Sequence, residues 1–184
     1  MASKIKSWTT LNSHLVFDGS PWLQVYRDTV STGDRIVDDF HRIKAADFAL
    51  VYATVPGGRI VMLQQWRQGP GRISLCFPGG HVDSGESDAI AAMRELSEET
   101  GYTADAPHLA GRFSMHSNFG VGWGSFFIAS GARRVAEPAS DDLEAPDILL
   151  VTPEDLRQAL HNGRISTMHD AICAQFGLAH TGRS

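Results

Sequence analysis

The chain is poor in cysteine and in long apolar runs. Its 184 residues include only Cys76 and Cys173, which are too far apart for a paired metal-ligand or disulfide motif. This scarcity argues against a disulfide framework or a zinc site and favours a reducing compartment. No run approaches the ~18 apolar residues of a membrane-spanning helix, and the segment MASKIKSWTTLNSH lacks the apolar core of a signal peptide. We therefore expect a cytoplasmic protein with no membrane partner.

Clustered positive charge is also missing. The formal net charge is −5 and no Lys/Arg-rich run is present, so we expect no nucleic-acid partner that binds through its phosphates. A small anionic ligand would instead need local arginines or bound cations. The 42% hydrophobic and 20% charged content is typical of a globular protein, and the length suits one domain with a small extra layer.

Turn-forming residues divide the chain into predicted strands. Gly19-Ser20-Pro21 and Thr32-Gly33-Asp34 separate β-rich runs near the N-terminus, and Pro56-Gly57-Gly58 joins two apolar runs that predict a buried hairpin. Other predicted strands have the sequences RISLCF, APHLAGRFSMH, GWGSFFIASGA and ILLV.

Helix signals follow in the second half. Residues 87–100 contain no glycine or proline and are rich in helix formers, with Asp88 in the first turn and Gly101 as a stop. Thr152 and Pro153 are typical of a helix start, and a last helix is expected over about 167–178. Strands and helices mixed within one unit predict an α/β layered domain.

Three glutamates crowd the end of the first predicted helix. Glu95, Glu98 and Glu99 are spaced i, i+3 and i+4, which places them on one face. Such carboxylates repel each other unless a cation neutralises them, and oxygen ligands suit Mg²⁺, with Mn²⁺ as an alternative. The other face offers apolar side chains to a core, namely Ala89, Ile90, Met93 and Leu96. The competing interpretation is a solvated acidic face balanced by Arg94, four residues before Glu98.

The stretch GGHVDSGESDAIAAMRELSEETGY reproduces the Nudix box without a gap. Its fixed positions are Gly80, Glu86, Arg94, Glu95, Glu98, Glu99 and Gly101. With each identity at a frequency of roughly 7%, seven matches arise by chance about once in 10⁸ positions. The chain therefore resembles a Nudix hydrolase.

This resemblance implies a Nudix-type α/β/α sandwich with a mixed sheet, together with an N-terminal antiparallel β region. We assign residues 1–44 to that β region and residues 45–184 to the Nudix domain. The metal ligands implied by the resemblance are Glu95, Glu98, Glu99 and the carbonyl of Gly79 or Gly80. It also implies that Glu86 and Arg94 brace the loop and helix and that Gly101 ends the helix.

The segment VMLQQWRQGPGRISLCFPGGHVDSGES is similar to the ADP-ribose pyrophosphatase branch of this family. The similarity places Arg67 where a phosphate-contacting arginine would lie, although a surface salt bridge is an equal alternative. It implies a homodimer in which each N-terminal sheet contributes to the partner's nucleotide pocket. It also implies a catalytic base or extra metal ligand at Glu144, with Asp141 or Asp142 as substitutes.

Two departures from that branch widen the expected substrate range. Cys76 stands where the branch commonly has glutamate, and FSMHSNFGVGWGSFF lacks the proline often found after the box. Substrate-binding candidates in this stretch are Asn118 and Trp123, with His116 and Phe119 beside them. The alternative is that Phe119 and Trp123 pack under their loop.

The leading hypothesis is a Mg²⁺-dependent pyrophosphatase that splits a nucleoside diphosphate linked to another group, either ADP-ribose-like or a nucleotide sugar. In this hypothesis Glu98, Glu99 and Glu144 carry the catalytic step. Two alternatives use the same box: a house-cleaning hydrolase of nucleoside triphosphates, and a nucleotide-sugar sensor without hydrolysis.

Overall fold

The computed structural model describes residues 5–139 and 143–182. The chain divides into two compact units, each considered by itself. The first unit contains residues 1–47 and 114–123, and the second contains residues 48–113 and 124–184. None of the helices in the described ranges combines the length and apolarity needed to cross a membrane.

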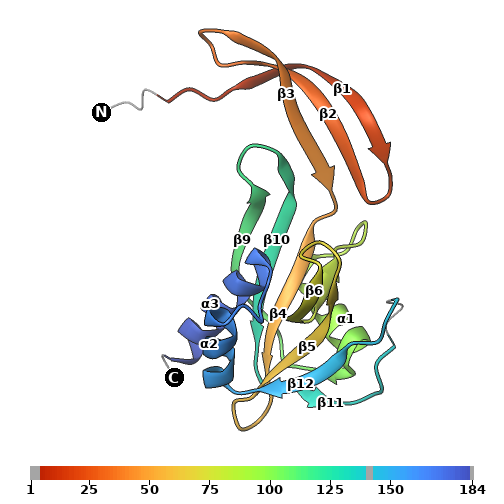
Figure 1. Cartoon of the computed structure of the whole chain (residues 1–184), viewed down its shortest axis with the longest axis vertical. Coiled ribbons are helices and arrows are strands. Elements are labelled where there is room, and N and C mark those ends of the chain that lie inside the picture. Colours follow the sequence, from red (N-terminus) through yellow and green to blue (C-terminus); the bar gives the residue numbers. More distant parts are fainter. Residues whose placement is uncertain (1–4, 140–142, 183–184) are drawn as a thin grey trace. The chain divides into compact units, whose positions relative to one another are not determined.

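The first unit is built on an antiparallel meander of three strands (Figure 1). Its strands are β1 (Thr9–Gly19), β2 (Leu23–Ser31) and β3 (Ile36–Ala45), so both predicted turn clusters fall between strands. The tip of a later hairpin joins this sheet, where the N–H of Ile43 donates to the carbonyl of Phe119 at 2.8 Å.

Few side chains are buried in this sheet. Val30 and the carboxylate of Asp28 are buried, whereas many large apolar side chains are exposed. The exposed set in the meander and its flanks includes Trp8, Leu11, Leu15, Val16, Phe17, Trp22, Leu23 and Ile36.

The second unit contains a mixed sheet around the central strand β4 (Phe48–Thr54). Strand β10 (Gly120–Ala129) runs parallel to β4 on one side. On the other side β5 (Ile60–Arg67) is antiparallel, as the predicted hairpin requires, and β12 (Asp147–Val151) lies beyond it.

Shorter strands complete the pairing. β6 (Arg72–Cys76) pairs with β5, β7 (Gly79–His81) with β4, and β9 (His108–His116) with β10. A separate two-stranded ladder joins β8 (Tyr102–Thr103) to β11 (Arg133–Arg134).

Helices cover both faces of this sheet, and Figure 1 shows α1 on one side with α2 and α3 on the other. They are α1 (Asp88–Thr100), α2 (Pro153–His161) and α3 (Met168–Thr181). Alternation along β4 explains the layers, because Ala49, Val51 and Ala53 pack with α1 while Leu50 and Tyr52 pack with α2 and α3.

The predicted helix α1 has the expected ends and a partly different buried face. The hydroxyl of Ser87 accepts from the N–H of Ile90 at 3.4 Å, and Gly101 ends the helix with φ of 72°. The prediction that Ile90 enters the core is wrong, since its side chain is 62% exposed. The predicted Leu96 is buried, and Ala89 and Met93 are partly buried against the same cluster. Ala91 and Ala92, which the prediction did not include, are also buried.

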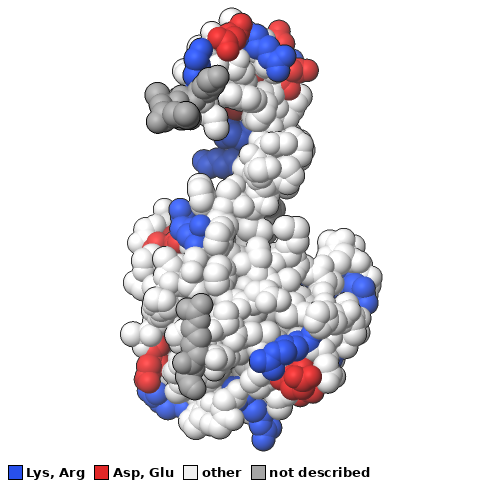
Figure 2. Space-filling view, turned by 90° about the vertical axis from the view of Figure 1, so that its left-hand side faces the viewer, with Lys and Arg blue, Asp and Glu red and all other residues white. Residues whose placement is uncertain are grey.

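Charge on the molecular surface is dispersed. On the face shown in Figure 2, Lys and Arg are interspersed with Asp and Glu, and the described residues there form no continuous basic patch. Large uncharged areas separate these charges. Such a face gives no extended track for a polyanion.

Candidate active site

The turn formed by Gly79 and Gly80 brings the backbone close to two neighbours. Strand β7 pairs with β4, and a Cβ on Gly79 would lie 2.2 Å from the carbonyl oxygen of Ala49. A Cβ on Gly80 would lie 2.4 Å from Oε1 of Glu95. Glycine is therefore required at Gly79, where the neighbour is backbone, whereas a Cβ at Gly80 would displace the flexible carboxylate of Glu95.

Two of the three glutamates reach this turn from α1. The carboxylate of Glu95 lies against Gly80, and the carboxylate of Glu99 accepts the N–H of Gly79 at 2.8 Å. Glu99 is only 7% exposed. The competing interpretation of a solvated acidic face is therefore wrong at Glu99, because the turn covers that part of the helix.

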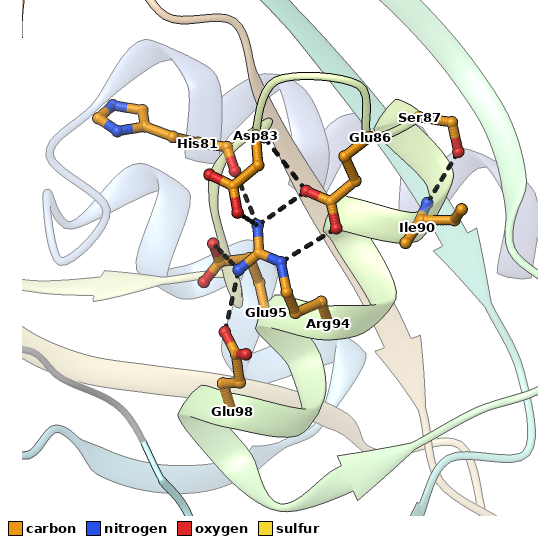
Figure 3. Close-up of polar contacts among 8 residues, drawn as sticks. All are labelled: His81, Asp83, Glu86, Ser87, Ile90, Arg94, Glu95 and Glu98. Carbon is orange, nitrogen blue, oxygen red and sulfur yellow. Dashed lines mark hydrogen bonds and ion pairs between the residues drawn. The ribbon is translucent and has the colours of Figure 1, made fainter. Parts of the chain in front are cut away.

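Arg94 joins the remaining carboxylates (Figure 3). One of its terminal nitrogens donates to Glu95 at 2.8 Å and to Glu98 at 2.9 Å. The rest of the guanidinium makes a two-pronged contact with Glu86, at 3.0 Å for each bond, and donates to the carbonyl of His81 at 2.9 Å. One arginine thus ties α1 to the loop before it and neutralises part of the acidic cluster.

The same loop is closed by Glu86, which also accepts the N–H of Asp83 at 3.2 Å. The hydrogen bonds from Arg94 are the main cause that lowers the pKa of Glu86, against a smaller opposing effect of burial. Glu86 is therefore ionised at neutral pH and remains a partner of Arg94.

The fit of a metal ion depends on donor chemistry. Among residues 5–139 and 143–182, no group of three or more His, Cys, Asp or Glu side chains is arranged to hold an ion; in this arrangement Arg94 and the Gly79 N–H are hydrogen-bonded to the carboxylates. Three carboxylates within two turns of helix, two of them against a glycine backbone, nevertheless form the all-oxygen set that hard divalent cations prefer. The residues present fit such an ion.

Arg67, at the end of β5, contacts Cys76 on the adjacent strand β6. Its Nε donates to the sulfur of Cys76 at 3.3 Å. Burial is the largest cause that raises the pKa of the Cys76 thiol, with Asp170 adding to it and Arg67 opposing it. The thiol is therefore neutral at physiological pH. Its contact with Arg67 is a hydrogen bond to sulfur and not a salt bridge with a carboxylate.

Glu144 and Arg67 line the same hollow of about 360 Å³, whose other lining residues are Gln65, Trp66, Gln68 and Leu143. The structure thus brings together two candidates that lie 77 positions apart in the chain. Asp141 and Asp142 lie outside the described residues. The sequence interpretation did not single out Trp66, although it is 51% exposed; a large aromatic residue in a polar segment, QQWRQ, was the available signal.

The other substrate-binding candidates belong to the first unit, whereas the box residues belong to the second. Nδ1 of His116 accepts from the N–H groups of Asn118 and Phe119 at 3.2 and 3.1 Å, and its ring stacks on Phe119. The N–H of Trp123 donates to Asp47 at 2.9 Å. The rings of Phe119 and Trp123 are each nearly half exposed, so they are not buried beneath their loop.

Comparison with known proteins identifies the family. The family model of the NUDIX domain matches residues 44–171 of this chain. The chain belongs to the Nudix family. Its resemblance to this family, its α/β/α class and its assignment as a Nudix pyrophosphatase are confirmed.

Relatives of this Nudix chain include pyrophosphatases. It is 25% identical to an ADP-ribose pyrophosphatase from Bacillus subtilis (strain 168) over 168 residues, which cover 91% of this chain and 90% of that protein. It is 44% identical to an ADP-sugar pyrophosphatase from Mus musculus over 46 residues, 25% of this chain and 21% of that protein.

A solved structure supports the fold. The crystal structure of an ADP compounds hydrolase superposes with a TM-score of 0.82, covering 100% of both chains at 18% sequence identity. Enzymes of the Nudix family generally use a divalent metal ion and act on small nucleoside diphosphate substrates.

Proposed function

We propose that this Nudix enzyme hydrolyses the diphosphate bond of ADP-ribose or a nucleotide sugar, giving a nucleoside monophosphate and a phosphorylated partner, with Mg²⁺ as the ion. The observation that carries the proposal is the convergence of Glu95 and Glu99 on the Gly79–Gly80 turn. Glu98 is connected to this cluster by a hydrogen bond from Arg94. The names of the relatives above support the choice of substrate.

The residues that would hold the ion are Glu95, Glu98, Glu99 and a carbonyl of the glycine turn. When bound, Mg²⁺ supplies neutralisation of the diphosphate charge and lowers the pKa of a bound water. Arg94 keeps the carboxylates from repelling each other before the ion arrives, because it shares its donors between Glu95 and Glu98.

Arg67 and Glu144 take the remaining roles in this proposal. The Arg67 guanidinium is held by Cys76 at one nitrogen, which leaves its two terminal nitrogens to present a fork to phosphate oxygens. Glu144 lines the same hollow and can accept the proton of the attacking water as a general base. Asn118 and Trp123 remain proposed substrate-binding residues.

A homodimer and the domain assignment 1–44 and 45–184 are part of the proposal. The support for the dimer is the number of large apolar side chains exposed on the meander, because a concentration of exposed apolar surface is typical of interfaces. Residues 1–44 would form the dimerisation region and contribute to the nucleotide pocket. The cytoplasmic location stays a prediction from composition.

The test is a substrate panel with Mg²⁺ and chromatographic separation of products. The panel contains ADP-ribose, GDP-mannose, UDP-glucose, NADH, a dinucleoside polyphosphate and nucleoside triphosphates. We expect preferential cleavage of ADP-ribose or a nucleotide sugar into two monophosphates, abolished by a chelator and restored by Mg²⁺.

Other outcomes would overturn the proposal in different ways. Release of diphosphate from triphosphates alone would identify a house-cleaning hydrolase. Thermal stabilisation by a nucleotide sugar without any turnover would identify a sensor.

A further inference from the structure

Asp170 is a fully buried carboxylate in the first turn of α3, with 0% of the residue exposed. One of its oxygens accepts the backbone N–H of Phe77 at 2.8 Å, 93 positions earlier in the chain. The other oxygen accepts the hydroxyl of Thr167. Burial of a carboxylate is costly because the ion loses its water. The hydrogen bonds from Phe77 and Thr167 offset this cost.

Capping of α3 does not require this carboxylate. The hydroxyl oxygen of Thr167 caps the helix by accepting the N–H of Asp170 at 3.4 Å. His169 lies 3.6 Å from the carboxylate, but burial lowers the pKa of that imidazole, which is therefore neutral at physiological pH. His169 is thus no cationic partner; the hydrogen bond to the Phe77 N–H connects Asp170 to the turn, and Arg67 interacts electrostatically with the same carboxylate.

Phe77, whose N–H is bonded to Asp170, is the first residue of the segment that leads into the glycine turn. The carbonyl of Pro78, the next residue, accepts the N–H of Val51 on β4 at 3.0 Å. The residue after that, Gly79, donates its N–H to Glu99 on α1. Three consecutive residues, Phe77 to Gly79, are therefore held by three different elements, α3, β4 and α1.

This arrangement couples the two helix layers. The core of α2 and α3 lies on one face of the sheet and the core of α1 on the other. Asp170 is the polar contact from the α3 side, and Glu99 is the contact from the α1 side. Loss of the first leaves the turn attached only to β4 and α1, so the backbone at Gly79 and Gly80 gains freedom relative to the carboxylates.

We propose that Asp170 is a positioning residue of the hydrolytic site, which acts through the Phe77 N–H to fix the glycine turn against Glu95 and Glu99. The inference rests on the metal site of the proposed function. Partners that orient metal ligands without touching the ion typically change metal affinity or activity about 10–100-fold when removed.

The experiment measures Mn²⁺ binding to the full chain without substrate, by the EPR signal of free Mn²⁺, alongside kcat and KM. In Asp170→Ala we expect Mn²⁺ binding and kcat each to fall about tenfold or more, with KM changed less than about threefold. In Asp170→Asn, the amide oxygen can still accept the Phe77 N–H, so most of both quantities is retained.

Leu156→Ala is the control for a purely structural role. Leu156 is fully buried on α2 in the same core cluster as α3 and makes no polar contact with the turn. The Leu156→Ala substitution should lower the stability of the fold, yet we expect wild-type Mn²⁺ affinity at temperatures where the variant is folded. If Asp170→Ala does not fold, Thr167→Val removes the hydroxyl that orients the carboxylate and is expected to weaken Mn²⁺ binding and kcat in the same direction.

Two results would overturn the inference. One is a folded Asp170→Ala variant, or Thr167→Val in its place, with wild-type Mn²⁺ affinity and kcat. The other is an Asp170→Asn loss as large as that of alanine, since the hydrogen bond would then not be the cause. Wild-type protein that binds no Mn²⁺ and cleaves no substrate would instead remove the proposed function, and the inference with it.

Discussion

Arg94 holds together an acidic cluster that would otherwise repel itself. Its side chain donates to Glu86, Glu95, Glu98 and the carbonyl of His81. These contacts raise the pKa of Arg94, chiefly through the Glu86 hydrogen bonds. Because a guanidinium has five N–H donors in a rigid fork, lysine could not replace this set of contacts. At the scale of single residues, a fixed positive charge therefore holds these carboxylates in place.

Replacement of one glutamate by glutamine removes the negative charge and keeps nearly the same side-chain shape. Glu98→Gln or Glu99→Gln should lower kcat by about 10²–10³-fold, since neutralisation of transition-state charge is lost. Both variants should fold, because the glutamine oxygen at position 99 can still accept the Gly79 N–H. Steady-state kinetics and thermal melting test this. Glu154→Gln, an exposed carboxylate on α2, is the control and should keep the wild-type rate. A near wild-type rate for either box variant would exclude that glutamate from the mechanism.

At the scale of elements, the proposed active site is a junction between β7 and α1. β7 has only three residues, and its pairing with β4 brings the glycine backbone against the helix. The close packing depends on the missing side chains at Gly79 and Gly80, as the short Cβ distances show. The sheet thus fixes one side of the site and the helix the other.

Gly80→Ala tests that junction. The new methyl group would meet the Glu95 carboxylate at 2.4 Å, and the carboxylate must turn away because it is the flexible partner. We expect a folded protein whose kcat falls at least about tenfold, as the charge is moved from its place. Gly69→Ala is the matched control, since an added Cβ there meets nothing within 4 Å. Equal rates for the two variants would contradict this account of the turn.

The β1–β2–β3 meander has its own polar core. Asp28 is buried, and burial raises its pKa, but hydrogen bonds from Arg42 and Ser13 together with the charge of Arg42 outweigh that effect, so the pKa is lowered overall. A carboxyl whose pKa is lower in the folded state stabilises the fold above its unfolded value of about 3.8, and this stabilisation is lost as pH falls through the lower folded value.

Asp28→Asn should therefore make the free energy of unfolding depend less on pH in the acid range. We expect a melting temperature several degrees lower at pH 7, consistent with about 1–3 kcal/mol for a lost charged hydrogen-bond partner. The difference from the wild type should shrink as pH falls through the lowered folded pKa of Asp28, because the wild-type carboxyl then becomes protonated too. Melting curves from pH 2.5 to 7 test this, and a constant offset at every pH would contradict it.

At the scale of the whole molecule, the two units differ in how they are stabilised. The second unit has two apolar cores, one for each helix layer. The meander of the first unit buries little and exposes many large apolar side chains. A sheet of this kind gains stability from an additional surface, because apolar area removed from water is favourable by about 25 cal/mol per Å².

A second copy of the chain is the proposed source of that surface. Light scattering should give about 40 kDa, twice the 20.0 kDa of one chain. Phe17→Asp should shift the mass toward the monomer, since it places a charge in the exposed apolar set of the meander. Val135→Asp, which changes a similarly exposed apolar residue in the second unit, is the control and should leave the mass unchanged. A monomeric wild-type protein would exclude the dimer.

Local chemistry determined what the sequence alone could predict. The helix start at Thr152, the helix stop at Gly101 and the glycine-rich turns act within a few residues, so their signals are readable in order along the chain. The spacing of the three glutamates follows from the helical repeat, and the box pattern identified the family before any fold was available.

Only the tertiary structure decided which helix face is covered and which distant groups meet. The helical repeat predicts a face but not the neighbour that covers it, so Ile90 was wrongly placed inside and Glu99 outside. The hollow shared by Arg67 and Glu144 and the bond from Phe77 to Asp170 both join residues far apart in the chain. Such contacts depend on how the layers pack around the sheet, and no local signal in the sequence encodes them.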